Sequence, residues 1–367
     1  MNVKFGMLDR MYKMHETEYE NAVLETLQSG WYILGNKLAK FENDFAEYIG
    51  TNYCIGVGSG LDALILAIRS LGIGNGDEVI VPANTYIATV LGITENHAVP
   101  VFVEPDEYYN IDVEKIEKYI TEKTKAILVV HLYGQACNME RVMEIANKHH
   151  LYVIEDCAQA HGATWNGKRV GSFGDIGCFS FFPTKNLGAF GDGGAITTNN
   201  ERIQNDILRL RNYGSRIKYV HEVEGVNSRL DELQAALLSV KLTHLNALTE
   251  ERISIAERYT KSINNPCVIL PSCRNCATHV YHLYVVRVKD RDKFQEYLKK
   301  NGIDTQIHYP IPPHKSECYK KYKWSQVELP ITEQYADEIV SLPLYNGMTD
   351  EEIAYVIRVI NEFDEEE

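Results

Sequence analysis

Leu151-Tyr152-Val153-Ile154-Glu155-Asp156 is an apolar run that ends in two carboxylates. It follows a helical pattern over residues 139–149, and its length and apolar character predict a strand buried in a sheet. Further apolar runs, also spaced by helical patterns, occur at residues 78–82, 99–103 and 126–130. Buried strands that alternate with helices are typical of a mostly parallel sheet with helices on both faces. We therefore expect Asp156 at the carboxyl edge of that sheet, where such folds bind ligands.

The pattern changes in the last third of the chain. Helices are expected over 231–246 and 251–263, and a strand over 284–288 precedes helices over 291–301 and 351–363. This indicates an α/β protein with a large domain over 1–247, including an N-terminal segment, and a smaller α+β domain over 248–367. The length of 367 residues also favours two or three domains.

Composition narrows the class of protein. Hydrophobic residues make up 45% and charged residues 24%, which are globular values. A net charge of −14 disfavours nucleic acids and anionic membranes as partners. No apolar stretch is long enough for a membrane span, and residues 1–20 lack a signal-peptide pattern. The eight scattered cysteines are expected to be free thiols in the cytoplasm, and no metal site is predicted.

A single lysine stands in an almost uncharged, glycine-rich stretch, Phe181-Phe182-Pro183-Thr184-Lys185-Asn186-Leu187-Gly188. Apolar neighbours remove water from an amine and lower its pKa, and a neutral amine can form a Schiff base with an aldehyde. A carboxylate can in turn keep a pyridine nitrogen protonated, so that the ring accepts electrons. Asp156 and Lys185 together therefore predict pyridoxal phosphate as the cofactor, with both residues catalytic.

The phosphate of that cofactor needs backbone donors. Gly56-Val57-Gly58-Ser59-Gly60-Leu61 precedes an apolar helix, and glycines at a helix N-terminus expose free N–H groups. The same stretch raises an alternative from another class, a nicotinamide-dependent sugar-nucleotide oxidoreductase. The dinucleotide fingerprint needs a third glycine that this G-x-G-x-G run lacks, and that chemistry gives Lys185 no role.

Several long motifs occur in a characteristic order: residues 29–33, 82–86, 131–135, 155–162, 179–188, 191–194 and 225–230. In this order they strongly resemble the DegT/DnrJ/EryC1/StrS family across nearly the whole chain. These are pyridoxal-phosphate-dependent sugar aminotransferases of the aspartate aminotransferase fold type. The resemblance implies the same fold, cofactor and reaction type here.

The resemblance also implies roles at matching positions around the cofactor ring. Lys185 matches the lysine that forms the Schiff base, and Asp156 matches the partner of the pyridine nitrogen. Gln159 matches the residue beside the phenolic oxygen, and Tyr86 matches the aromatic residue that stacks on the ring. Core packing for Tyr86 and a turn cap for Gln159 stay open as alternatives. His161 is given no chemical role.

For the phosphate, Ser180 and the backbone N–H groups of Gly60 and Leu61 match the family's cradle. Relatives often carry threonine or serine where this chain has Leu61, so only a backbone donor is expected there. Asn227 matches a residue lent by the neighbouring subunit, which implies a homodimer with a shared active site. A helix cap near 228 is the alternative for Asn227.

The substrate is expected at the stiff loop Gln306-Ile307-His308-Tyr309-Pro310-Ile311-Pro312-Pro313-His314. In the family, the form His-Tyr-Pro-x-Pro-x-His resembles the branch that aminates C3 of a dTDP-linked 3-keto-6-deoxyhexose, with L-glutamate as donor. Amination at C4 of a 4-keto-6-deoxy sugar is the alternative. The substrate-binding residues expected in this loop are His308, Tyr309, Pro310 and His314.

Cations are needed for the nucleotide diphosphate. Arg216 and Lys218 are candidates for the pyrophosphate and Tyr219 for stacking, with a solvated basic turn as the alternative.

Two other activities are weighed against transamination. Related sugar dehydratases carry histidine in place of the Schiff-base lysine, so Lys185 argues against a dehydratase. The intact aspartate–lysine pair argues against a catalytically silent regulator.

Overall fold

The computed structural model describes residues 1–364, and a seven-stranded sheet forms its centre. Neighbouring strands among β2, β3, β4, β5 and β8 run parallel, whereas β9 is antiparallel to both β1 and β8. The predicted α/β fold with a mostly parallel sheet is therefore confirmed. In spatial order the strands are β1 (Tyr53–Val57), β9 (Gly194–Thr198), β8 (Ile176–Ser180), β5 (Tyr152–Asp156), β4 (Thr124–Val130), β2 (Glu78–Pro82) and β3 (Val99–Val103).

Helices cover both faces of this sheet because side chains alternate along each strand. On β4, Ile127 and Val129 pack with one hydrophobic cluster, while Ala126 and Leu128 pack with another. The first cluster includes α3 (Asn36–Ile49), α7 (Met139–His149) and α9 (Glu232–Ser262). The second includes α4 (Gly60–Ser70), α5 (Ile87–Thr94) and α8 (Glu201–Leu210).

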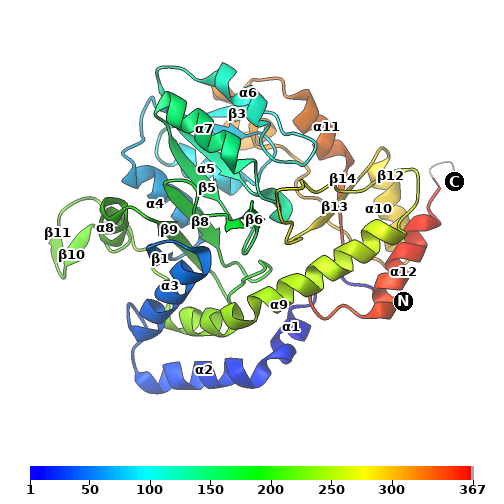
Figure 1. Ribbon diagram of the computed structural model, residues 1–367, viewed down its shortest axis with the longest axis horizontal. Coiled ribbons are helices and arrows are strands. Elements are labelled where there is room, and N and C mark those ends of the chain that lie inside the picture. The colour runs from blue at the N-terminus through cyan, green and yellow to red at the C-terminus, as the bar shows by residue number, and fades with distance from the viewer. Residues whose placement is uncertain (365–367) are drawn as a thin grey trace.

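The helix α9 runs without a break for 31 residues, from the sheet toward the C-terminal elements (Figure 1). The expectation of two helices, over 231–246 and 251–263, is therefore wrong. No glycine or proline interrupts residues 232–262, so nothing in the backbone stops the helix. The expected domain boundary at 247 falls inside α9, and the division into two domains stays a prediction.

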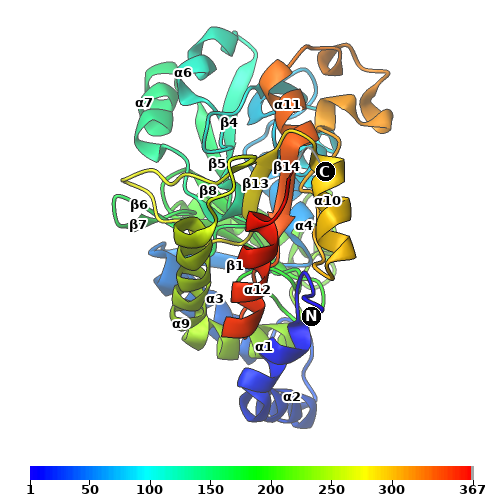
Figure 2. The ribbon, with the colours of Figure 1, turned by 90° about the vertical axis from the view of Figure 1, so that its right-hand side faces the viewer.

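Beyond α9 the chain forms a second, smaller core. A three-stranded antiparallel sheet packs with helices there (Figure 2). Val3, near the N-terminus, is buried in the same core and forms an isolated bridge with Ile303. Among the described residues no helix is both long and apolar enough to cross a membrane. The elements of this part are β12 (Val268–Ile269), β13 (Tyr284–Val288), β14 (Ile339–Leu342), α10 (Arg291–Lys300), α11 (Pro330–Glu338) and α12 (Asp350–Asn361).

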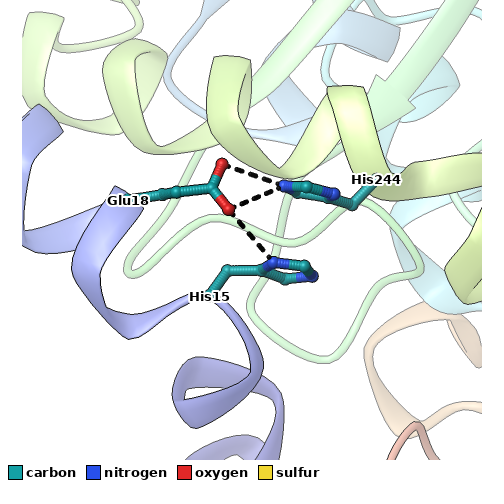
Figure 3. A group of neighbouring side chains, drawn as sticks. All are labelled: His15, Glu18 and His244. Carbon is teal, nitrogen blue, oxygen red and sulfur yellow. Dashed lines mark hydrogen bonds and ion pairs between the residues drawn. The ribbon is translucent and has the colours of Figure 1, made fainter.

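An N-terminal arm of α1 (Leu8–Met14) and α2 (Glu16–Ser29) lies along α9 (Figure 1). Glu18 joins His15 at 3.3 Å and His244 of α9 at 3.0 Å (Figure 3). The two imidazole rings stack with centroids 3.6 Å apart and planes 11° apart. Because imidazole lone pairs lie in the ring plane, two stacked rings do not aim at one ion, and Glu18 serves as a bridge between helices.

Two buried carboxylates fix loops around the sheet. Glu155 accepts N–H groups from Gly171, Phe173 and Gly174 and also pairs with His131 at 3.1 Å. Both carboxylate oxygens of Glu155 are thus occupied by donors of the protein itself. Because three of these donors belong to residues 171–174, Glu155 holds the turn that leads into β8. Glu232 accepts the N–H groups of Gly35, Lys37 and Leu38 at 2.8–2.9 Å, which caps the N-terminus of α3 from α9.

Replacing Glu232 with alanine should leave these three donors without their acceptor. We expect the free energy of unfolding to fall by about 2–4 kcal/mol, since each buried unsatisfied group is costly. Thermal unfolding of Glu232→Ala is the measurement, with Glu250→Ala, at an exposed position of the same helix, as the control. Equal Tm values for the two variants would show that the cap contributes little.

Candidate active site

The carboxyl edge of the sheet gathers most of the predicted cofactor residues. Asp156 is the last residue of β5 and Ser180 is the last residue of the neighbouring β8. Gly60 begins α4 just beyond β1, and Tyr86 is the residue before α5, beyond β2. Strands that end at one edge therefore bring together positions that are far apart in the chain.

Asp156 is 5% exposed and both of its carboxylate oxygens accept hydrogen bonds. Thr89 of α5 donates to Oδ2 at 2.8 Å, and the backbone N–H of Ala158 donates to Oδ1 at 3.1 Å. Burial raises the pKa of Asp156, while these hydrogen bonds and the charge of Lys185 oppose the rise. Each oxygen keeps a lone pair, so the carboxylate can still accept an N–H from a ligand.

Lys185 stands in a closed loop next to this carboxylate. The loop is held by backbone hydrogen bonds from Lys185 to Phe182, from Phe181 to Gly193 and from Ala189 to Phe181, all 2.8 Å long. Burial lowers the pKa of Lys185 to about 8, and the charge of Asp156 opposes this lowering. A fraction of the amine is therefore neutral, and nucleophilic, near neutral pH, as the sequence predicted.

A close backbone contact forms a cradle at the N-terminus of α4. A Cβ added to Gly60 would lie 2.5 Å from Cβ of Ser180, and one added to Gly194 would lie 2.3 Å from the carbonyl oxygen of Ser59. Side chains are thus excluded at both glycines. The backbone N–H groups of Gly60 and Leu61 lie in the first turn of α4, so neither has an acceptor within the helix. The Ser180 hydroxyl lies beside them. This set suits a phosphate.

Aromatic side chains form one wall of the site. The rings of Tyr86 and Tyr309 lie 4.9 Å apart, and Gln159 donates to the Tyr309 hydroxyl at 3.1 Å. Gln159 also accepts the backbone N–H of Tyr133 at 2.7 Å. His308 bonds Ser341 at 2.8 Å, and burial together with the charge of Lys185 lowers its pKa to about 4. The predicted substrate loop thus reaches the predicted cofactor residues through Tyr309.

Three predicted substrate residues lie apart from this cluster. Arg216, Lys218 and Tyr219 belong to an exposed hairpin of β10 (Ser215–Ile217) and β11 (Val220–His221) that projects from the body beyond α8 (Figure 1). Tyr219 is 81% exposed, and Arg216 pairs with Glu222 of the same hairpin region at 3.6 Å. Within one chain, this hairpin does not complete the site around Lys185.

Three further predicted residues differ in their surroundings. Asn227 is exposed, and since α9 begins at Glu232 with Asp231 before it, the alternative of a helix cap at Asn227 is wrong. Pro310 is exposed. His314 is buried, pairs with Glu333 at 3.2 Å and packs near the Phe102 ring, so its predicted contact with substrate stays a prediction.

The structure also adds residues that the sequence analysis missed. Thr89 holds Asp156, and Tyr133 donates from its hydroxyl to the His308 carbonyl. Asn186, beside Lys185, donates to Val280 at 3.0 Å and bonds His282 at 3.2 Å. Thr89 could have been found from the sequence, because it follows Tyr86 by one helical turn and so faces the same edge.

A family model described as the DegT/DnrJ/EryC1/StrS aminotransferase family matches residues 13–361. The chain belongs to this family. Membership confirms the resemblance inferred from the motifs and agrees with a site built from a buried carboxylate and a lysine of low pKa.

Relatives in the aminotransferase family are similar over most or all of their length. One is the dTDP-3-amino-3,6-dideoxy-alpha-D-galactopyranose transaminase of Aneurinibacillus thermoaerophilus, 54% identical over 98% of this chain and 99% of the relative. Among solved structures, S. venezuelae DesV in complex with a ketimine intermediate has a TM-score of 0.96, with 43% identity and 98% coverage of both chains. NtdA from Bacillus subtilis with bound cofactor PMP has a TM-score of 0.90, with 33% identity over 96% of this chain and 83% of that one.

The neutral fraction of Lys185 can be measured without a cofactor. In the cofactor-free protein, the rate of Lys185 modification by an amine-reactive aryl fluoride should rise with pH around a midpoint near 8. Asp156→Asn should move that midpoint downward, because the carboxylate charge favours the protonated amine. Peptide mapping by mass spectrometry gives the rates. An unchanged midpoint in Asp156→Asn would show that the two groups do not interact.

Proposed function

We propose that this protein transfers an amino group from L-glutamate to C3 of a dTDP-linked 3-keto-6-deoxyhexose, with pyridoxal 5′-phosphate as cofactor. The observation that carries the proposal is Lys185, an amine of lowered pKa beside the buried carboxylate Asp156. The similarity to the dTDP-3-amino-3,6-dideoxy-alpha-D-galactopyranose transaminase of A. thermoaerophilus supports the sugar and nucleotide. The bound PMP of NtdA supports the cofactor.

The residues at the sheet edge fit this cofactor. Bound there, pyridoxal phosphate would supply a carbonyl for the amine and a ring that accepts electrons from Cα of the amino acid. Asp156 would hold a proton at the ring nitrogen, and Thr89 would keep that carboxylate oriented. Gly60, Leu61 and Ser180 would bind the phosphate. Tyr86 would lie against the ring and Gln159 beside its phenolic oxygen.

Lys185 would also move protons. Its free amine would act as a base within the site, because its pKa, about 8, is close to neutral pH. Proton removal from the donor and proton return to the sugar-derived carbon can use this one group.

We further propose that the protein is a cytoplasmic homodimer. Its two chains would share each active site, and the remaining predicted residues would act there. Asn227 and the hairpin residues Arg216, Lys218 and Tyr219 are exposed on one chain, which suits contact with a second copy and its bound nucleotide. His308, Tyr309, Pro310 and His314 are proposed to contribute from the loop of the same chain. Free thiols at all eight cysteines suit a reducing compartment.

Lys185→Ala should abolish turnover and also the visible absorbance band of the bound cofactor. The reason is that alanine offers no amine to bond the cofactor or to move protons. Purified parent and variant should be assayed with glutamate and a panel of 3-keto and 4-keto dTDP- and UDP-sugars. Turnover only of a 4-keto sugar would replace the C3 assignment with C4. Full activity of Lys185→Ala would overturn the proposed mechanism.

Asp156→Asn should keep the fold and bind the cofactor but lower kcat by about 100-fold or more, because an amide does not hold the ring nitrogen protonated by charge. Single-turnover rates with glutamate measure this step alone. Thr89→Val is the matched control, because it removes one hydrogen bond to Asp156 and keeps the carboxylate. Its kcat should fall far less than that of Asp156→Asn. A loss of only a few-fold in Asp156→Asn would make the carboxylate structural.

A further inference from the structure

Lys241 is a buried lysine on α9 that no role described so far explains. Its side chain is 3% exposed, and Nζ donates to the carbonyl oxygen of Gly188 at 3.2 Å. Burial, aided by the nearby charge of Arg252, lowers the pKa of Lys241 to about 7. On the same helix, Lys261 is 75% exposed at its side chain and pairs with Glu257, as surface lysines commonly do.

The position of Lys241 costs stability. A buried amine loses its hydration, and among the described residues the three N–H donors of Lys241 have one acceptor, the Gly188 carbonyl. The flanking helix positions Leu238, Leu242 and Leu245 are buried in the apolar cluster against the sheet. An unbranched apolar side chain of the same length would suit these surroundings better. Lys241 therefore contributes something other than packing.

Its acceptor belongs to the loop of Lys185. Gly188 lies three residues after Lys185, and a Cβ added to it would lie 2.3 Å from the carbonyl oxygen of Pro183, so the loop folds back tightly there. The backbone N–H of Ala189, the next residue, is bonded to Phe181 at 2.8 Å. The carbonyl of Gly188 is thus a fixed point of a short closed turn. A shift at this carbonyl would be passed to Lys185.

The two sides of the loop are held differently. Asn186 attaches it to the segment of Val280 and His282, whereas Lys241 attaches it to α9. Near this point lies His161, which is fully buried, has its ring close to those of Phe179 and Phe181, and makes no hydrogen bond to the Gly188 carbonyl. His161 therefore does not replace Lys241 as a donor to the loop.

We propose that Lys241 is a positioning residue, whose hydrogen bond to the Gly188 carbonyl holds the Lys185 loop at the depth that its chemistry requires. This inference rests on the proposed function, since it assigns Lys185 as the reacting amine. Lys241 itself touches neither cofactor nor substrate. It acts through the backbone between Gly188 and Lys185.

Lys241→Met tests the proposal, because methionine is similar in length and apolar but donates no hydrogen bond. We expect a Tm equal to or above that of the parent, since the buried amine is removed. The pH midpoint of Lys185 modification in the cofactor-free protein should move upward, because a loosened loop admits water to the amine. With cofactor bound, kcat should fall by about tenfold or more, while KM for glutamate changes less.

Two controls separate the outcomes. Lys261→Met on the exposed side of α9 should change none of these values. Lys241→Arg keeps a donor and should recover part of the lost kcat. A lower Tm in Lys241→Met with an unchanged Lys185 midpoint and unchanged kcat per bound cofactor would make Lys241 a structural residue and overturn the proposal. Failure of the proposed function would appear separately, as absence of transamination in the parent.

Discussion

The central constraint is the placement of one carboxylate and one amine together at the carboxyl edge of the sheet. Burial disfavours the charged form of each group, so it raises the pKa of Asp156 and lowers that of Lys185. Their mutual attraction opposes both shifts. The result is an amine whose pKa is about 8, close enough to neutral pH to lose and regain a proton. The sheet, its loops and α9 all hold this pair in place.

That placement depends on parallel topology and on close backbone contacts. Asp156 and Ser180 end neighbouring strands, so both reach the same edge without long loops. The cradle at α4 exists because Gly60 and Gly194 have no side chains that would collide with their neighbours. Structural carboxylates complete the frame, since Glu155 and Glu232 each collect several backbone donors from segments distant in sequence.

Local patterns in the sequence predicted much of this arrangement. Apolar runs marked the strands, and the apolar setting of Lys185 predicted its lowered pKa. Continuity of α9 was missed because the polar run Thr249-Glu250-Glu251-Arg252 interrupts the apolar pattern, although no glycine or proline there breaks the helix. Lys241 was missed because it acts through Gly188, which is distant in sequence, whereas Thr89 was overlooked although it lies one helical turn after Tyr86. The position of Arg216, in an exposed hairpin apart from the other predicted site residues, was missed because a local motif does not show where its segment lies in the fold.

Borohydride reduction of the cofactor-loaded protein, followed by peptide mapping, tests the central claim most directly. Reduction makes a bond between cofactor and lysine permanent, so the labelled residue can be read by mass. The account predicts the label on Lys185, and it predicts that prior incubation with glutamate removes the label by transferring the cofactor away from the lysine. A label on another lysine, or one that glutamate does not change, would contradict the account.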